Sequence, residues 1–232
     1  MKIRKIIKKV LMLIGILIIA FLIAFSVYVN IYNKSEVSLS EYSTVMEKDK
    51  DLIFEGNETK ADIIFYPGAK VEKEAYLPLC EKLNSYGYTV IIIDMPFKLA
   101  FFNISGAEKY ISNTKDTYLM GHSLGGAMAA SFAKDRSDIT GIILLGSYSA
   151  NKFSNKNLKC LSVYGNLDSV LNKTAYKENY KNLLNVSEFI IDGGNHSNFG
   201  SYGLQKGDTK SSISSDEQKK ITATKINEFI GG

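Results

Sequence analysis

The sequence contains few of the residues that build covalent cross-links or metal sites. Its 232 residues include two cysteines, Cys80 and Cys160, and two histidines, His122 and His196. Two cysteines are too few for a disulfide framework, and each lies in an apolar stretch, so we expect a pair of buried free thiols. The sequence has no CxxC motif and two histidines, so it offers too few ligands for a dedicated zinc site. We expect neither a metal nor an organic cofactor.

Outside its first nine residues, the sequence also has no excess of positive charge. The formal charge is +4, but Lys2, Arg4, Lys5, Lys8 and Lys9 supply five cations within the first nine residues. The remaining 23 basic residues face 24 acidic ones. This balance provides no basic surface that could follow a phosphate backbone, which makes nucleic acid a poor candidate partner.

A long run without charge follows these cations. The twenty residues from Val10 to Val29 carry no charge, and a helix of about this length crosses a bilayer core of roughly 30 Å. A cleaved signal peptide usually has an apolar region of only about 7–15 residues, so the run predicts an uncleaved anchor. Ala24-Phe25-Ser26 is a passable cleavage site, and cleavage is the alternative. Because positive charge stays in the cytoplasm, we expect residues 1–9 there, 10–30 across the cell membrane and the remainder outside.

Residues 31–50 are polar and aperiodic, which indicates a stalk, and residues 51–232 have the length of one globular domain, expected to be a monomer. In this domain, short apolar runs alternate with helical segments. Continuous Val, Ile and Leu runs separated by helices predict a mostly parallel sheet covered on both faces. Its working residues should follow the carboxyl ends of the strands. The predicted strands are 61–67, 88–96, 117–121, 139–147, 158–165 and 187–194; the predicted helices are 72–87, 124–135, 174–184 and 215–230.

The stretch "TYLMGHSLGGAMAA" places Ser123 between a predicted strand and a predicted helix, with Gly121 and Gly125 on either side. A nucleophile elbow needs glycine at both positions because its turn is too tight for side chains there. The helix amino terminus also directs free amides toward the place where negative charge would develop. The pattern therefore predicts that Ser123 is a nucleophile and that the Leu124 amide is one donor to an oxyanion.

A serine hydroxyl needs an adjacent base, and an imidazole base needs a carboxylate to fix its tautomer. His122 lies inside the elbow and should point away from Ser123, which leaves His196, just past a predicted strand. Asp168 follows another strand and a glycine turn, and completes the chain order Ser, Asp, His of one large hydrolase fold. Asp192 is the rival acid, but its short separation from His196 favours a role in the turn.

Acyl transfer needs a second donor for the oxyanion. The loop after the first predicted strand, "FYPGAKV", should provide it, with Gly68 allowing close approach and the Ala69 amide as the expected donor. The alternative for Pro67-Gly68 is an ordinary turn.

Together these residues resemble an α/β-hydrolase, and specifically the small bacterial group known as the α/β-hydrolase fold-5 family. The resemblance spans about residues 50–230. It implies an α/β-hydrolase fold, here behind one predicted transmembrane helix, and a serine hydrolase with Ser123, Asp168 and His196 as its triad. One departure is Ala69, where many relatives carry glycine. The stretches that carry the resemblance are "YPGAKVEKEAY", "DMPFKLAFFN", "GHSLGGAMAA", "YGNLD" and "GGNHSNFGSYGLQKGD".

The expected reaction is cleavage of a carboxylic ester or related acyl bond of a small molecule or lipid. A loop too short for a cap, "SYSANKFSNKN", follows the fourth predicted strand, so the pocket should be open. Apolar residues in "MPFKLAFFN" could form an acyl-binding wall or be core residues under a loop. An acyltransferase with the same triad, and a non-catalytic binding domain on the same scaffold, are the alternatives.

Overall fold

The computed structural model describes residues 2–57, 60–112 and 114–231. These residues form two compact units, Met1–Tyr32 and Asn33–Gly232. The first unit is the helix α1, Lys2–Asn30, which is longer than the predicted anchor because the basic residues at its start are also helical. Within it, Ile3–Asn30 is long and apolar enough to cross a membrane.

The second unit is built on an eight-stranded sheet with the order β1-β2-β4-β3-β5-β6-β7-β8. The strands from β4 to β8 in this order are parallel, whereas β1 and β2 are antiparallel to their neighbours. The mostly parallel α/β fold predicted from the sequence is thus confirmed. The strands are β1 Val45–Lys48, β2 Asp51–Phe54, β3 Asp62–Tyr66, β4 Thr89–Ile92, β5 Thr117–His122, β6 Gly141–Leu145, β7 Lys159–Gly165 and β8 Val186–Ile191.

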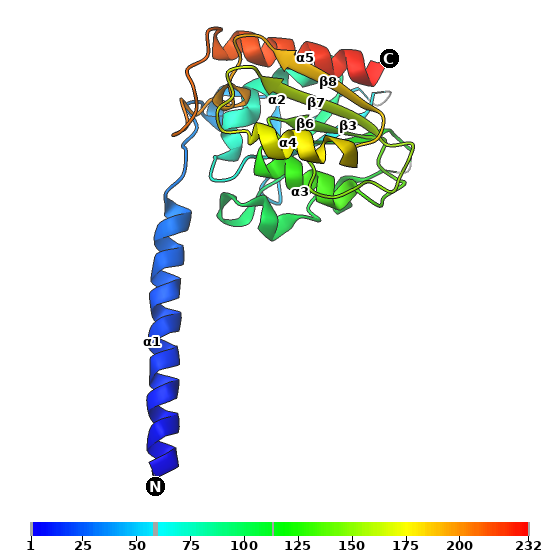
Figure 1. Ribbon diagram of the computed structural model, residues 1–232. Coiled ribbons are helices and arrows are strands. Elements are labelled where there is room, and N and C mark those ends of the chain that lie inside the picture. Colours follow the sequence, from blue (N-terminus) through cyan, green and yellow to red (C-terminus); the bar gives the residue numbers. More distant parts are fainter. Residues whose placement is uncertain (1, 58–59, 113, 232) are drawn as a thin grey trace. The chain divides into compact units, whose positions relative to one another are not determined.

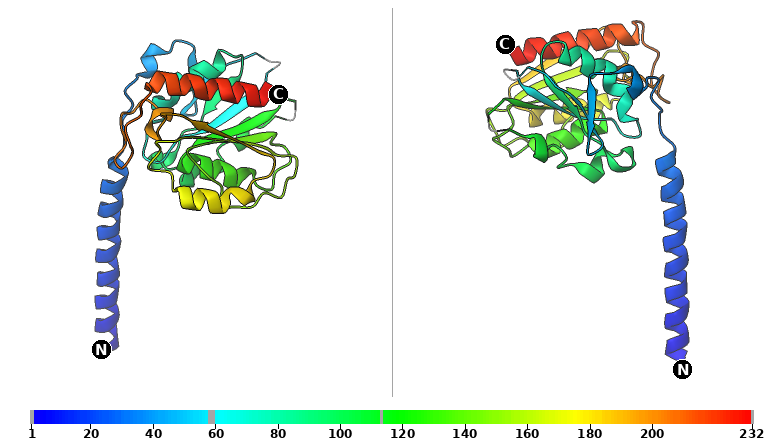
Figure 2. Two further views of the ribbon diagram at one scale, coloured as in Figure 1. Left: turned by 45° about the horizontal axis from the view of Figure 1, so that its top comes forward. Right: turned by 180° about the vertical axis from the view of Figure 1, so that it is seen from behind.

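Helices cover both faces of this sheet. Figures 1 and 2 show α2 and α5 over one face and α3 and α4 over the other. Alternate residues of β3 enter opposite cores: Phe65 packs on the side of α2 and α5, and Ile64 on the side of α3. Both strand faces are therefore apolar, which is why the sequence reads as continuous apolar runs. The α-helices of this unit are α2 Leu77–Asn84, α3 Leu124–Ala133, α4 Lys173–Asn179 and α5 Ser215–Gly231.

Short 3₁₀ helices occupy several of the connections. Three of them, η3, η4 and η5, lie in the connection between β4 and β5, and η7 begins directly after His196. Between β6 and β7, residues 146–158 contain no helix or strand, so no cap domain is inserted there. Cys80 and Cys160 are free and buried, as expected. The 3₁₀ helices are η1 Leu39–Glu41, η2 Lys73–Tyr76, η3 Pro96–Lys98, η4 Ala100–Asn103, η5 Glu108–Tyr110, η6 Tyr180–Asn182 and η7 Ser197–Phe199.

The structure differs from the expected stalk at residues 33–50. Asn33 pairs with Val71 in a parallel bridge, and the Glu36 amide donates to the Ser201 carbonyl over 2.8 Å. The β1 strand then joins the edge of the sheet. The polar composition of this segment does not predict the arrangement, because backbone groups make these contacts. A few of its apolar side chains also pack against the core: Val37, Leu39, Tyr42 and Val45. The second unit accordingly starts at Asn33 instead of residue 51.

Candidate active site

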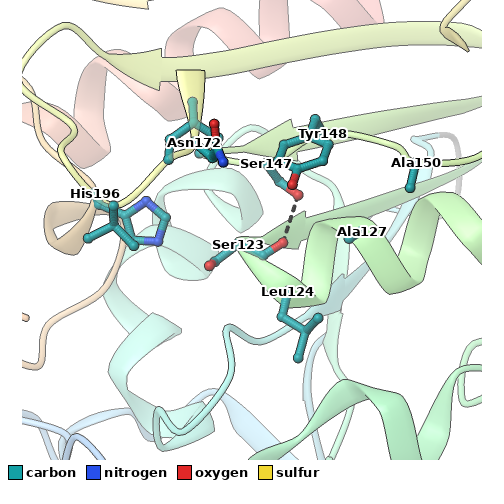
Figure 3. A pocket seen from close by; sticks show the side chains of 11 residues that line it. Ser123, Leu124, Ala127, Ser147, Tyr148, Ala150, Asn172 and His196 are labelled. Atoms are coloured by element: carbon teal, nitrogen blue, oxygen red, sulfur yellow. Dashed lines mark hydrogen bonds between the residues drawn. The ribbon is translucent and has the colours of Figure 1, made fainter. Parts of the chain in front are cut away.

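Ser123 occupies the sharp turn between β5 and α3. Its backbone has φ 53° and ψ −124°, in the left-handed half of conformational space that non-glycine residues rarely adopt. Two hydrogen bonds hold this conformation: the Ser123 amide donates to the Leu145 carbonyl over 2.9 Å, and the Ser147 hydroxyl donates to the Ser123 carbonyl over 2.7 Å (Figure 3). The turn thus has the strained geometry of a nucleophile elbow.

The two flanking glycines are required by close backbone approach. A Cβ atom on Gly121 would lie 2.5 Å from the amide nitrogen of Gly126. A Cβ atom on Gly125 would lie 2.1 Å from the Tyr66 carbonyl oxygen, so the first turn of α3 rests directly on the end of β3. No side chain fits at either position. This lack of space is why the elbow requires glycine there, as the sequence pattern predicts.

His196 and Asp168 form a buried pair at the carboxyl ends of β7 and β8. His196 Nδ1 lies 2.8 Å from Asp168 Oδ2, and each residue is 1% exposed. The other carboxylate oxygen, Oδ1, accepts hydrogen bonds from the amides of Val170 at 2.9 Å and Leu171 at 2.8 Å. These amides fix the carboxylate, which in turn directs the imidazole proton to Nδ1 and leaves Nε2 as the basic nitrogen.

Asp192, the rival acid, is exposed and turned to another partner. Its Oδ1 atom accepts a hydrogen bond of 2.6 Å from Asn166 Nδ2. The same Asn166 side chain accepts from the Gly193 amide over 2.9 Å. Asp192 therefore belongs to the turn that closes β8, and the carboxylate in contact with His196 is that of Asp168.

Ser123 and His196 line the same pocket. Figure 3 shows the Ser123 hydroxyl directed toward the imidazole ring. His196 Nε2 is buried and has no hydrogen-bond partner among the residues that the structure describes. In ligand-free structures, the bond between a nucleophile and its base is often long and shortens with substrate. The arrangement can thus remove a proton from Ser123 and return it to a leaving group.

The loop after β3 contacts the elbow from both sides. Gly125 touches the Tyr66 and Pro67 carbonyls, and a Cβ atom on Gly68 would lie 2.8 Å from His122 Nδ1. The Gly68 amide already donates to the Tyr76 hydroxyl over 3.0 Å, so it is not available to a substrate. Ala69, whose amide is the predicted second donor, follows Gly68 in this loop; it is not among the residues that line the pocket beside Ser123, whereas Leu124 is.

His122 connects this loop to His196. Its Nδ1 atom lies 2.9 Å from the Tyr76 hydroxyl, and its ring centroid lies 4.5 Å from that of His196. Burial, followed by the nearby His196, holds the pKa of His122 well below its ordinary value, so this imidazole is neutral at neutral pH. A neutral ring can pack beside His196 without opposing the charge that His196 acquires as a base.

Sequence reasoning does not find two residues that shape the site. Tyr76 comes from η2, and nothing in its sequence context distinguishes it from a core tyrosine. Gly146 has φ 51°, and a Cβ atom there would lie 2.9 Å from His196 Nδ1 and 3.1 Å from Asp168 Oδ2. A glycine directly after a buried strand is a signal that could have pointed to Gly146.

The pocket beside Ser123 has a volume of about 330 Å³. Its apolar side chains come from α3 and from the loops after β6 and β7, and its polar side chains are those of Ser123, Ser147, Tyr148, Asn172 and His196. A pocket that combines apolar side chains with a few polar groups suits an acyl group attached to a reacting carbonyl. The apolar lining consists of Leu124, Ala127, Ala150, Val170 and Leu171.

Comparisons with known proteins agree with this geometry. Residues 62–220, more than half of the chain, match the Alpha/beta hydrolase family. No curated protein sequence matches the chain.

Three solved structures illustrate the similarity of fold. MGS-MChE2, an alpha/beta hydrolase enzyme from a sediment metagenome of the lagoon of Mar Chica, Morocco, has a TM-score of 0.60 and 13% identity over 81% of this chain and 97% of its own. Est1E from Butyrivibrio proteoclasticus has a TM-score of 0.54 and 16% identity, covering 82% and 100%. Dienelactone hydrolase from Anabaena variabilis has a TM-score of 0.57 and 14% identity, covering 78% and 91%. At such identities the similarity shows the fold.

The hydrogen bonds of Tyr76 lead to a prediction about stability. Tyr76→Phe leaves the Gly68 amide and His122 Nδ1 without a partner in a buried place, and each such group costs about 1–3 kcal/mol. We expect the variant to unfold at a clearly lower denaturant concentration. Tyr164→Phe is the matched control, because the structure records no hydrogen bond of the Tyr164 hydroxyl within the described chain. Equal unfolding midpoints for the two variants would show that the Tyr76 bonds contribute no net stability.

Proposed function

Since the chain belongs to the α/β hydrolase family, we propose that it is a serine hydrolase that cleaves a carboxylic ester or related acyl bond through an acyl-enzyme. The observation that carries the proposal is the contact of 2.8 Å between His196 Nδ1 and Asp168 Oδ2, in a pocket that also contains Ser123. It gives the imidazole the tautomer that a general base requires.

In the proposed reaction, Ser123 Oγ attacks the substrate carbonyl carbon while His196 Nε2 takes the hydroxyl proton. The amides of Ala69 and Leu124 donate hydrogen bonds to the oxyanion. His196 then gives its proton to the leaving alcohol, and the acyl group remains on Ser123. Water, deprotonated by His196, then attacks the acyl-enzyme. The bond from the acyl carbon to Ser123 Oγ breaks, His196 returns the proton to Oγ, and the carboxylic acid leaves. All proton transfers use His196, so the reaction as proposed requires no metal or organic cofactor.

The substrate is proposed to be a small molecule or a lipid with an acyl group that enters the apolar pocket. A volume of about 330 Å³ and the missing cap suit a short acyl group with a leaving group that extends into solvent. The unit is proposed to act as a monomer without nucleic acid.

Labelling with a fluorophosphonate tests the proposal. This reagent phosphonylates a serine only when a base activates its hydroxyl, so we expect labelling of the intact protein at Ser123 and none of Ser123→Ala. Ser85→Ala, which removes an exposed serine outside the pocket, should retain the label. A protein that is folded but never labelled would support the non-catalytic alternative, and product analysis with added alcohols would detect acyl transfer.

Two acid variants test the assignment of Asp168. Asparagine at 168 would turn its oxygen to the Val170 and Leu171 amides and its NH₂ group to His196 Nδ1, which moves the imidazole proton to the wrong nitrogen. We expect Asp168→Asn to lower turnover on the order of 10⁴-fold. Asp192→Asn should keep most of the activity because Asp192 contacts Asn166. The reverse pattern, at equal thermal stability, would transfer the role to Asp192.

We also propose that α1 anchors the protein in the cell membrane with the catalytic unit outside the cytoplasm. Five cations at the start of α1 and its long apolar run support this orientation. Protease added to intact cells should digest the catalytic unit while the protein fractionates with membranes. Protection until cell lysis would contradict the orientation. A soluble form that begins near Val27 would identify a cleaved signal instead.

A further inference from the structure

Three phenylalanine rings gather on the surface of the loop after β4. Phe97, Phe101 and Phe102 are 51%, 64% and 47% exposed. The Phe97 and Phe102 ring centroids lie 5.4 Å apart, and those of Phe101 and Phe102 lie 5.6 Å apart. These rings form one cluster, which we call the Phe surface. Clustered exposed apolar side chains mark a site of contact with another molecule or a membrane.

The sequence suggests two roles for the apolar residues of this loop, an acyl-binding wall and core residues, and the Phe surface matches neither. Within the same loop, Met95 and Ala100 are buried and belong to the core. The three phenylalanines are too exposed to be core residues, and none of them lines the pocket beside Ser123. An acyl-binding wall would have to face that pocket.

Hydrogen bonds hold the loop in this exposed arrangement. Asn103 Nδ2 donates to the Asp94 carbonyl over 2.9 Å, and the Tyr66 hydroxyl donates to the Ile104 carbonyl over 2.7 Å. Phe97 and Lys98 both have φ 57°, an uncommon conformation for residues with a side chain. The rings are therefore presented by an anchored loop, and their exposure is a built feature of the unit.

The chain that follows α1 is fixed beside this loop. The Lys70 amide donates to the Lys98 carbonyl over 2.7 Å, and the Asn33 amide donates to the Lys70 carbonyl over 2.7 Å. Two residues, Ile31 and Tyr32, separate Asn33 from the end of α1 at Asn30. Three residue steps span at most about 10 Å, so the covalent chain limits the distance from Asn33 to the end of α1 in any orientation.

The charge of the loop also suits a lipid surface. Residues 95–107 contain no acidic residue, and Lys98 is their one charged residue. The acidic residues beside them, Glu72, Glu74 and Asp94, line a cavity together with Lys50, Lys73 and Lys98, so that the formal charges there cancel. A cation beside exposed phenylalanines is compatible with anionic headgroups, whereas a carboxylate would be repelled. We propose that the Phe surface inserts into the headgroup region of the bilayer that α1 crosses. This inference rests on the proposed anchoring by α1 and does not depend on the chemistry at Ser123.

The absence of tryptophan from the sequence allows a direct test. Phe101→Trp gives the full chain a single tryptophan on the Phe surface. After reconstitution into vesicles of zwitterionic and anionic phospholipids, its emission should fall on the order of twofold when the acyl chains carry bromine near their headgroup end, since interfacial side chains lie about 5–10 Å deep. Bromine near the methyl end should quench less.

Two further single-tryptophan variants make the result decisive. Phe21→Trp, within α1, should be quenched by deep bromine, and it tests the anchor separately from the Phe surface. Tyr86→Trp is the matched exposed control. Tyr86 precedes β4 and the Phe surface follows β4, so the two lie at opposite ends of that strand. We expect no lipid quenching there.

Quenching of Phe21→Trp without quenching of Phe101→Trp would overturn the proposal while retaining the anchor. A blue-shifted Phe101→Trp emission that brominated lipid does not quench would also overturn it, and would indicate that protein or substrate covers the rings.

Discussion

At Gly125 the first turn of α3 lies against the carbonyl oxygens of Tyr66 and Pro67, with room for no side chain. Because this contact joins the elbow to the loop after β3, it sets the distance between two otherwise separate pieces of backbone. One piece carries Ser123 and the Leu124 amide, and the other carries Ala69. Enlarging the contact by a single methyl group would move both. The strained backbone of Ser123 is tolerated because this packing and two hydrogen bonds overdetermine it.

The same kind of constraint operates on the other side of the pocket. Gly146 leaves just enough space for the pair of His196 and Asp168, and the amides after Asp168 hold its carboxylate. β6, β7 and β8 are neighbouring parallel strands, so their carboxyl ends deliver these residues to one edge of the sheet. The site is thus a property of the sheet edge, with glycine wherever two loops have to pass closely.

The beginning of the second unit is bonded to the same loops. Asn33 binds the loop that continues from Ala69, and the loop after β4 binds the same segment through Lys70. Three stretches that are distant in sequence therefore meet beside the site. Asn33 thus bonds to the residue next to Ala69, the proposed oxyanion donor of that loop.

The sequence by itself determines the parallel sheet, the elbow and the apolar α1 helix, because each leaves a local pattern: continuous apolar runs, glycines at fixed spacing and twenty residues without charge. It also indicates the order of Ser123, Asp168 and His196. The tertiary structure alone decides that residues 33–50 join the second unit and that Tyr76 contacts His122. The sequence favours Asp168 over Asp192 as the partner of His196, and the structure brings Asp168 into contact with that ring. The tertiary structure also decides that three loop phenylalanines remain exposed. These features depend on backbone hydrogen bonds and on contacts between residues far apart in the chain, which side-chain periodicity does not encode.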